Sequence, residues 1–126
     1  RTVRDFMSGA PIAVSPALSL RQLADDFVLR HHHEFFPVVE GDRILGLVTE
    51  SDLLGAVLTL GEDKAFDHCV RDIMVTSLVT ISADAPIRDL VPLFRKDYVA
   101  IVMDGERFLG LVTRIDLINH FRTAMR

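Results

Sequence analysis

The sequence predicts an α+β fold made of two similar halves, each with the element order β-α-β-β-α. The first observation is an octet that occurs twice, as GLVTESDL at Gly46–Leu53 and as GLVTRIDL at Gly110–Leu117. The second is that short β-branched runs and helically spaced apolar residues follow one another in the same order around both octets. The third is length, because a half of about 60 residues buries too little surface alone. We therefore expect the two halves to share one core.

The similarity extends upstream of the octets. FPVVEGDRIL (36–45) matches AIVMDGERFL (100–109), and VRDFM (Val3–Met7) matches VRDIM (Val70–Met74). The chain is therefore an internal duplication.

The duplication predicts the domain boundaries. We expect a first repeat at residues 1–60, a linker at 61–69 that carries glycine and charge, and a second repeat at 70–126. A pseudo-two-fold axis would relate the repeats, which we expect to pack through their sheets.

The first half opens with a predicted strand at 11–15, followed by a helix at 19–30 in which Ser19 and Gln22 form a capping box. Apolar runs on either side of Gly41-Asp42-Arg43 predict a hairpin, and a helix follows at 49–58.

The second half repeats this order, with a strand at 78–82, a helix at 86–97, a hairpin at 99–112 and a helix at 114–125. Pro92 lies inside the first of these helices, where it would cost about 3 kcal/mol in a regular helix. We therefore expect that helix to be kinked or short.

Composition excludes several classes of function. Hydrophobic residues make up 49% and charged residues 25% of the chain, as in a folded domain. The net charge of −4 and the lack of a Lys/Arg block predict no nucleic-acid partner. No apolar run approaches the ~18 residues of a membrane helix, so we expect no membrane insertion. The single cysteine, Cys69, fits a reducing, cytoplasmic location. Because the chain begins at Arg1, we expect a piece of a longer protein.

The octets allow two interpretations. Thr49 and Asp52, like Thr113 and Asp116, have the spacing of a capping box, in which the carboxylate reaches back to the cap residue. A helix N-terminus with a hydroxyl beside it also binds phosphate, and a carboxylate accepts hydrogen bonds from a sugar diol. Cap and binding site are compatible, so both interpretations stay open.

The two octets, their upstream segments and the two VRD motifs together resemble a tandem pair of cystathionine-β-synthase (CBS) domains, a Bateman module. The resemblance covers both repeats nearly end to end. It implies a regulatory module that binds AMP, ADP, ATP or S-adenosylmethionine in clefts between the repeats.

The resemblance also implies roles for individual residues. Asp52 and Asp116 would bind the ribose hydroxyls, Thr49 and Thr113 would contact phosphate, and Ser51 adds a hydroxyl to the first octet. The adenine would lie between apolar or small residues of the strands, for which the candidates are Ile12, Ala13, Pro37, Val38, Val79, Thr80, Ile101 and Val102. Family members that bind several phosphates often have a basic residue just before the second strand of each repeat. In this chain the basic residues His33 and Lys96 are displaced from that position. The resemblance therefore favours AMP or another lightly charged adenosyl compound.

The sequence gives little support for metal binding or catalysis. Residues His31–Glu34 read HHHE, but neighbouring side chains at a helix end diverge, whereas a metal needs converging ligands, so we expect a solvated helix terminus and no metal site. No nucleophile elbow, HExxH or Walker motif is present, and Cys69 is expected to be structural. We expect neither an enzyme nor a catalytic cofactor.

The sequence thus predicts a non-catalytic adenosyl-ligand sensor that controls a parent or partner protein. Self-association into a homodimer would use the helices after the octets, with Leu53, Leu54 and Val57 on one and Ile115, Ile118 and Phe121 on the other. The alternative is a ligand-free dimerisation scaffold within a larger enzyme or transporter, in which the octets serve only as caps.

Overall fold

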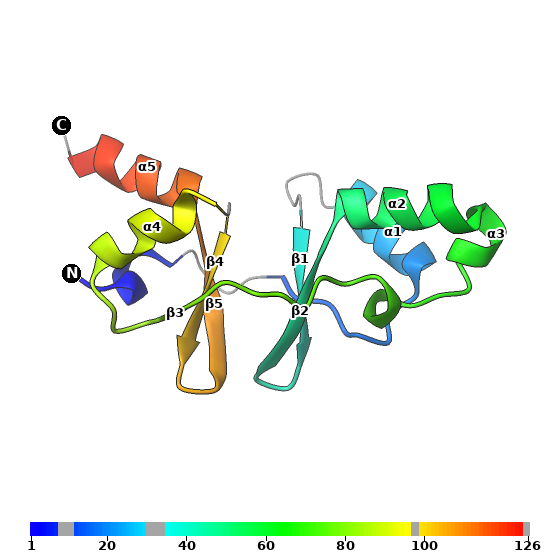
Figure 1. Ribbon diagram of the computed structural model, residues 1–126, viewed down its shortest axis with the longest axis horizontal. Coiled ribbons are helices and arrows are strands. Elements are labelled where there is room, and N and C mark those ends of the chain that lie inside the picture. The colour runs from blue at the N-terminus through cyan, green and yellow to red at the C-terminus, as the bar shows by residue number, and fades with distance from the viewer. Residues whose placement is uncertain (8–11, 30–34, 97–98, 125–126) are drawn as a thin grey trace. The chain divides into compact units, whose positions relative to one another are not determined.

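The computed structural model describes residues 1–7, 12–29, 35–96 and 99–124. The chain forms two compact units (Figure 1). Unit 1 consists of Arg1–Pro11 and Leu78–Arg126, and unit 2 consists of Ile12–Ser77. The VRD motif of each repeat therefore lies in the unit that contains the octet of the other repeat. We call Thr2–Met7 the first VRD segment and Cys69–Met74 the second VRD segment.

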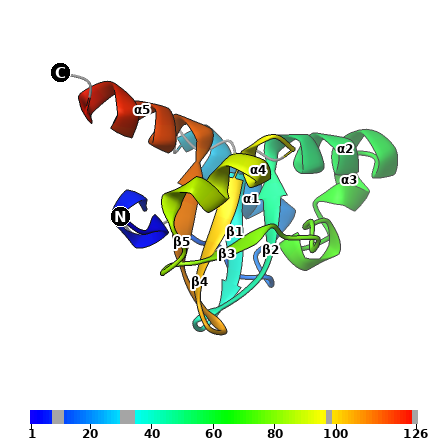
Figure 2. The same cartoon turned by 60° about the vertical axis from the view of Figure 1, so that its left-hand side comes forward.

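Unit 2 contains a two-stranded antiparallel sheet and the helices around it. The hairpin strands are β1 (Phe35–Glu40) and β2 (Arg43–Thr49). The helical segments are α1 (Leu20–Leu29), α2 (Glu50–Leu60), α3 (Glu62–Ala65) and the 3₁₀ turn η2 (Val70–Asp72). Figure 2 shows α3 directly after the end of α2, with Gly61 between them.

Unit 1 contains a three-stranded sheet with the order β3-β4-β5. The strands are β3 (Thr80–Ser82), β4 (Val99–Asp104) and β5 (Arg107–Thr113), with β3 parallel and β5 antiparallel to β4. The helical segments are η1 (Val3–Phe6), η3 (Ile87–Asp89), α4 (Leu90–Phe94) and α5 (Arg114–Ala124). The α+β class predicted from the sequence is confirmed.

The two hairpins share their irregularities as well as their sequence. Gly41 and Gly105, the first residues of the two-residue turns, have φ of 64° and 60°, a region that glycine adopts without steric cost. The register also shifts in both, between Val38 and Val39 and between Val102 and Met103. These shared features place the end of each hairpin, and hence each octet, in the same local geometry.

Two clusters of buried hydrophobic residues form, one within each unit, and a single core shared by both halves stays a prediction. The unit 1 cluster includes Val3 and Phe6 of the first VRD segment, and the unit 2 cluster includes Val70 of the second. These side chains pack against residues of the other repeat, so one repeat alone would leave them without a hydrophobic core. The exchanged VRD segments thus complete each core.

Two predicted elements differ from the structure, and a third agrees with it. In place of the strand at 11–15, the described residues show only a bridge between Val14 and Val38, because Pro16 has no N–H to extend a ladder. The predicted linker contains α3. The predicted helix at 86–97 is short, as expected: a 3₁₀ turn precedes α4, whose start at Leu90 places Pro92 in the first turn, where N–H groups lack helical partners.

Val75, which follows the second VRD segment, pairs with β2 at the edge that does not face β1. Leu47 and Val75 exchange two backbone hydrogen bonds, with N···O distances of 2.9 and 2.7 Å. Gly46 makes this approach possible, since a Cβ there would lie 2.7 Å from the carbonyl oxygen of Val75 and 2.9 Å from Sδ of Met74. At Gly110, the nearest atom of the described residues to a Cβ would be Sδ of Met7, at an ordinary 3.5 Å.

We predict that Gly46→Ala lowers the free energy of unfolding by about 1–3 kcal/mol, because the new methyl group overpacks against backbone. Gly110→Ala is the matched control and should leave stability unchanged or slightly raised, because alanine restricts the unfolded chain. Urea unfolding followed by circular dichroism measures both. Equal losses at the two glycines would contradict the role of Gly46.

Candidate functional site

Both octets span the junction where a buried strand passes into a helix. β2 ends at Thr49 and α2 begins at Glu50, while β5 ends at Thr113 and α5 begins at Arg114. The apolar Leu-Val pair before each threonine continues the strand, and the aspartate three residues later belongs to the first helical turn. The threonine therefore marks the change from extended to helical backbone.

In unit 2, Thr49 and Asp52 form the predicted capping box. The backbone N–H of Thr49 donates to Oδ2 of Asp52 at 2.8 Å, and the backbone N–H of Asp52 donates to Oγ1 of Thr49 at 3.1 Å. Thr49 has extended dihedral angles, as an N-cap residue requires. Both groups are part-buried.

In unit 1, Thr113 and Asp116 repeat this box with one more bond. The backbone N–H of Thr113 donates to Oδ2 of Asp116 at 2.8 Å, and the backbone N–H of Asp116 donates to Oγ1 of Thr113 at 3.2 Å. The Thr113 hydroxyl also donates to Oδ2 of Asp116, at 2.9 Å. The capping interpretation is thus confirmed for both octets, and it fixes each hydroxyl and carboxylate at a helix N-terminus.

The residues between cap and aspartate differ. The first octet has Glu50 and Ser51, both exposed, whereas the second has the half-buried Arg114 and the exposed Ile115. An anion near a helix N-terminus is attracted by the dipole, and a neighbouring arginine strengthens that attraction while a glutamate opposes it. The two boxes therefore have the same framework and different charge.

The proposed adenine-binding residues lie on or near β1 in unit 2 and on or near β4 in unit 1. Ile12 and Ala13 are exposed, and the next residue, Val14, donates its N–H to the carbonyl of Pro37. In unit 1, Thr80 pairs with Ile101, whose N–H donates to the carbonyl of the half-buried Val79.

Successive side chains of a strand point to opposite faces of its sheet, so the candidates on β1 and β4 fall into two groups. Val38 lies in the unit 2 cluster and Val102 in the unit 1 cluster. Pro37 and Ile101, which adjoin them in sequence, point to the opposite face of their sheets and are buried. Of the strand candidates, these two therefore face away from the helices that cover each core.

The structure contains two further boxes of the same kind, which the sequence analysis missed. The carboxylate of Asp5 accepts from the backbone N–H of Thr2 at 3.0 Å, and that of Asp72 accepts from the backbone N–H of Cys69 at 3.1 Å. Thr2 and Asp5 have the spacing of the octet residues, so the signal was present in the sequence. Cys69 is thereby a cap residue in the second VRD segment, and its thiol lies 3.6 Å from Oδ2 of Asp72.

The Asp72 carboxylate has a further partner in a histidine ring. Hydrogen bonds from the backbone of Cys69 and from the His68 ring, whose Nδ1 lies 3.2 Å from Oδ2, hold the pKa of Asp72 below its ordinary value of 3.8. His68 also accepts at its carbonyl from the N–H of Leu20, the first residue of α1. This box therefore ties the second VRD segment to the start of α1.

Within residues 1–7, 12–29, 35–96 and 99–124, no group of three His, Cys, Asp or Glu side chains could hold a metal ion. The histidine run His31–His33 lies outside these residues. None of the helices in the described ranges is long and apolar enough to cross a membrane.

Comparison with known sequences identifies the family. The sequence pattern of the CBS domain matches residues 3–59 and 70–123. The chain belongs to the CBS domain family, as a tandem pair.

The chain is similar to segments of longer proteins. It is 24% identical over 115 residues to a zinc metalloprotease of Methanocaldococcus jannaschii, covering 91% of this chain and 30% of that protein. It is 26% identical over 136 residues to an A-adding tRNA nucleotidyltransferase of Geobacter sulfurreducens, covering 98% of this chain and 14% of that protein. The chain thus spans less than a third of either relative.

Solved structures have the same fold. CBSX2 in complex with AMP is 23% identical, with a TM-score of 0.83 over 99% of this chain and 98% of that one. The CBS domain pair of the protein MJ0100, in complex with 5′-methylthioadenosine and S-adenosyl-L-methionine, is 22% identical, with a TM-score of 0.79 over 98% of each chain. The acetoin utilization protein AcuB of Vibrio cholerae is 19% identical, with a TM-score of 0.85 over 99% of this chain and 93% of that one.

We predict that Asp72 makes stability depend on pH in the acid range. Because its folded pKa is lowered, its ionised form stabilises the fold above about pH 4, and this contribution is lost as the pH falls through the folded pKa. Asp72→Asn should therefore be less stable than the wild type at pH 7, and the difference should shrink below about pH 4. Urea unfolding at pH 7, 4 and 3 measures it.

Asp67→Asn is the control, since the Asp67 carboxylate is exposed and makes no side-chain hydrogen bond within the described part of the chain. A difference between wild type and Asp72→Asn that stays constant from pH 7 to pH 3 would contradict the assignment.

Proposed function

We propose that this CBS pair is a non-catalytic regulatory module that senses an adenosyl compound. The observation that carries the proposal is the pair of matching Thr-Asp boxes at the N-termini of α2 and α5. Support comes from two proteins of the same fold whose structures hold AMP, or methylthioadenosine and S-adenosylmethionine. Binding would occur between the repeats, related by a pseudo-two-fold axis.

Each box has groups suited to a nucleoside. The Asp52 and Asp116 carboxylates would accept hydrogen bonds from ribose hydroxyls, and Thr49, Ser51 and Thr113 would serve a phosphate together with the N–H groups of the first helical turn. Pro37 and Ile101, on the sheet faces away from the cores, are the strongest candidates to contact adenine. Thr80 pairs with Ile101, whose N–H donates to the carbonyl of Val79. Ile12 and Ala13 precede Val14, whose N–H donates to the carbonyl of Pro37.

The charge difference between the octets predicts a difference in ligand. Arg114 would favour an adenosyl compound with a phosphate at the second box, such as AMP or a higher phosphate, because a guanidinium forms charge-assisted bonds with phosphate. Glu50 would oppose an anion at the first box and favour an uncharged or cationic one, such as S-adenosylmethionine.

The setting of the module is also a proposal. Its relatives are longer proteins, so we propose that it controls a larger parent or partner in the cytoplasm. A ligand that bound one arrangement of the module more tightly would shift its population by that difference in affinity. We propose, too, that the chain self-associates through α2 and α5.

A ligand-free dimerisation scaffold is the alternative. The observation in its favour is that each threonine and aspartate of the octets is engaged in its own capping box. A cap alone explains these hydrogen bonds, so the two functions differ only in whether an adenosyl compound binds.

We predict that Asp52→Ala and Asp116→Ala each weaken or abolish adenosyl binding at one site. Calorimetric titration with AMP, ATP and S-adenosylmethionine measures the effect. Asp5→Ala and Asp72→Ala are matched controls, because they remove the same hydrogen bond to a backbone N–H outside the octets. The controls should lose stability, because a backbone N–H at the start of the helical turn loses its partner, and keep the affinity of the wild type.

Binding that is unchanged in the double variant Asp52→Ala/Asp116→Ala would show that the site lies elsewhere. No heat and no rise in melting temperature with any of the three compounds would favour the scaffold, since a ligand at 100 times its Kd adds about 2.7 kcal/mol of stability.

We further predict that Arg114→Gln reduces affinity for AMP more than affinity for adenosine, because only AMP carries a phosphate. Glu50→Gln should raise affinity for AMP or leave it unchanged, by reducing repulsion at the first box. Titration of both variants with both compounds measures the ratio of affinities. An equal loss for AMP and adenosine in Arg114→Gln would show that Arg114 has no selective contact with phosphate.

A further inference from the structure

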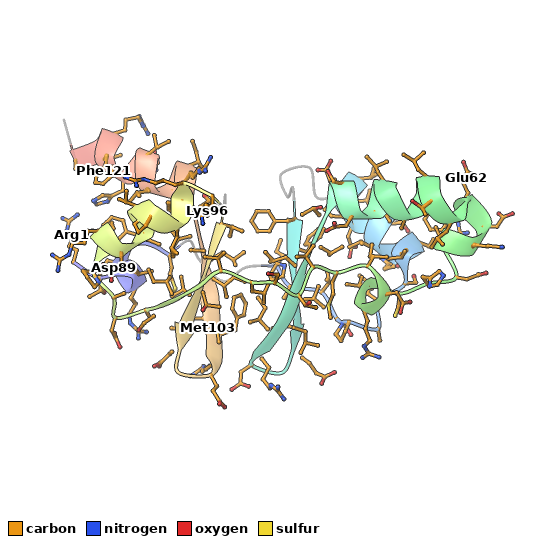
Figure 3. All side chains as sticks on the ribbon, in the orientation of Figure 1. Arg1, Glu62, Asp89, Lys96, Met103 and Phe121 are labelled. Atoms are coloured by element: carbon orange, nitrogen blue, oxygen red, sulfur yellow. The ribbon has the colours of Figure 1, made fainter. Side chains whose placement is uncertain are left out.

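The helix α5 connects its capping box, the second box, with the first VRD segment. Asp116 of the box lies in the first turn of α5, and His120 lies one turn later. The rings of His120 and Phe6 are 4.1 Å apart between centroids, in an edge-to-face arrangement. Arg1, which precedes the segment, donates from Nη1 to Nε2 of His120 at 2.8 Å. Figure 3 labels Arg1 and, on α5, Phe121, which follows His120 in the chain.

The packing of α5 on unit 1 depends in part on this segment. Leu117, the buried residue of α5, belongs to the same cluster as Phe6. His120 is half-buried, whereas Ile118 and Phe121 are 58% and 51% exposed. Elements with few buried contacts open at a low free energy, and elements that pack on one another open as a cooperative unit. The contacts of His120 and Leu117 therefore favour joint opening of α5 and the first VRD segment.

The equivalent elements of unit 2 are joined differently. Ala56 stands where α5 has His120, and Ile73 stands where the first VRD segment has its phenylalanine. Both pack in the unit 2 cluster through aliphatic groups alone. His68, which stands in the place of the arginine, binds Asp72 of its own box. Within the described part of the chain, these residues of unit 2 thus make no ring contact or hydrogen bond between helix and VRD segment.

We infer that His120 makes α5 and the first VRD segment open and close together, so that an adenosyl compound at the second box also holds this segment in place. The inference rests on the proposed function and adds which part of the chain responds to binding. The compound would need the first turn of α5 to be helical, because that turn places the N–H groups and the carboxylate of the box. It would therefore bind the closed form, in which α5 is folded and packed, and shift the population towards it.

Amide hydrogen exchange tests the coupling. The N–H groups of Val3 and Arg4 donate to the carbonyls of Ala85 and Ala83, each at 2.9 Å, so their exchange reports opening of the segment. Asp52→Ala is the background, because it leaves only the second box for the ligand. AMP at 100 times its Kd should slow exchange at both amides about 100-fold, the factor by which a ligand of the closed form reduces the open population. The open form is a minor one, so the chemical shifts of the segment stay in place.

The second VRD segment provides matched amides. Val70 and Arg71 occupy the same two positions in that segment and donate to the carbonyls of Leu18 and Pro16, at 2.8 and 3.0 Å. Their exchange should slow much less, because they belong to the unit that does not contain the second box.

His120→Ala, added to the same background, places the residue of the first repeat at this position. AMP should still bind and still slow exchange in the first turns of α5, which shows that the variant is folded. The slowing at Val3 and Arg4 should be lost. A purely structural role would speed exchange equally with and without AMP, and so would leave the ratio of the two rates unchanged.

The outcomes separate the inference from the proposed function. If AMP binds the Asp52→Ala protein by calorimetry but slows Val3 and Arg4 no more than Val70 and Arg71, the coupling is overturned and the proposed function stands. If His120→Ala keeps the slowing, the role of His120 is overturned. If AMP binds the wild type but not Asp52→Ala, the second box takes no AMP and the coupling is overturned. If AMP gives no heat with the wild type, AMP sensing fails and the coupling fails with it.

Discussion

The reach-back hydrogen bond of an aspartate to the backbone N–H three residues earlier is the interaction on which the local structure depends. It occurs at Asp5, Asp52, Asp72 and Asp116. In each case the chain changes from extended to helical backbone at the residue whose N–H is bound. A short carboxylate suits this position, because it satisfies a donor that the helix leaves unpaired and lies at the positive end of the dipole. The octets and the VRD segments thus share this hydrogen bond, which has a different structural role in each.

The two roles differ in which part of the structure the capping box positions. In the VRD segments, it fixes a 3₁₀ turn whose valine enters the core of the unit that contains the other octet. In the octets, it holds a hydroxyl and a carboxylate at the end of a hairpin whose turn and register shift are the same in both repeats. Gene duplication therefore provides two similar capping boxes, one in each unit, and exchange of the VRD segments makes each unit depend on both repeats. Substitutions between cap and aspartate then change charge without disturbing the cap.

The sequence predicted these parts because their signals are local. Hairpin turns, the Thr-x-x-Asp spacing and the proline in the second repeat each act within a few residues. The exchange of VRD segments could not be predicted in this way, since Val3 and Val70 look alike in sequence and only tertiary packing assigns each to a core. The close approach of the Val75 carbonyl that requires glycine at position 46 also depends on tertiary structure. The sequence showed that both positions are glycine, and among the described residues the structure shows a steric reason at Gly46.

The most direct measurement of the central claim is amide chemical-shift mapping by nuclear magnetic resonance during titration with AMP. Ligand at the boxes should shift the backbone N–H signals of Glu50–Asp52, Arg114–Asp116 or both, since these groups line the first turns of α2 and α5. The signals of Arg4–Asp5 and Arg71–Asp72, in boxes of the same geometry, should stay in place. Saturable shifts confined to residues outside the octets would contradict the account.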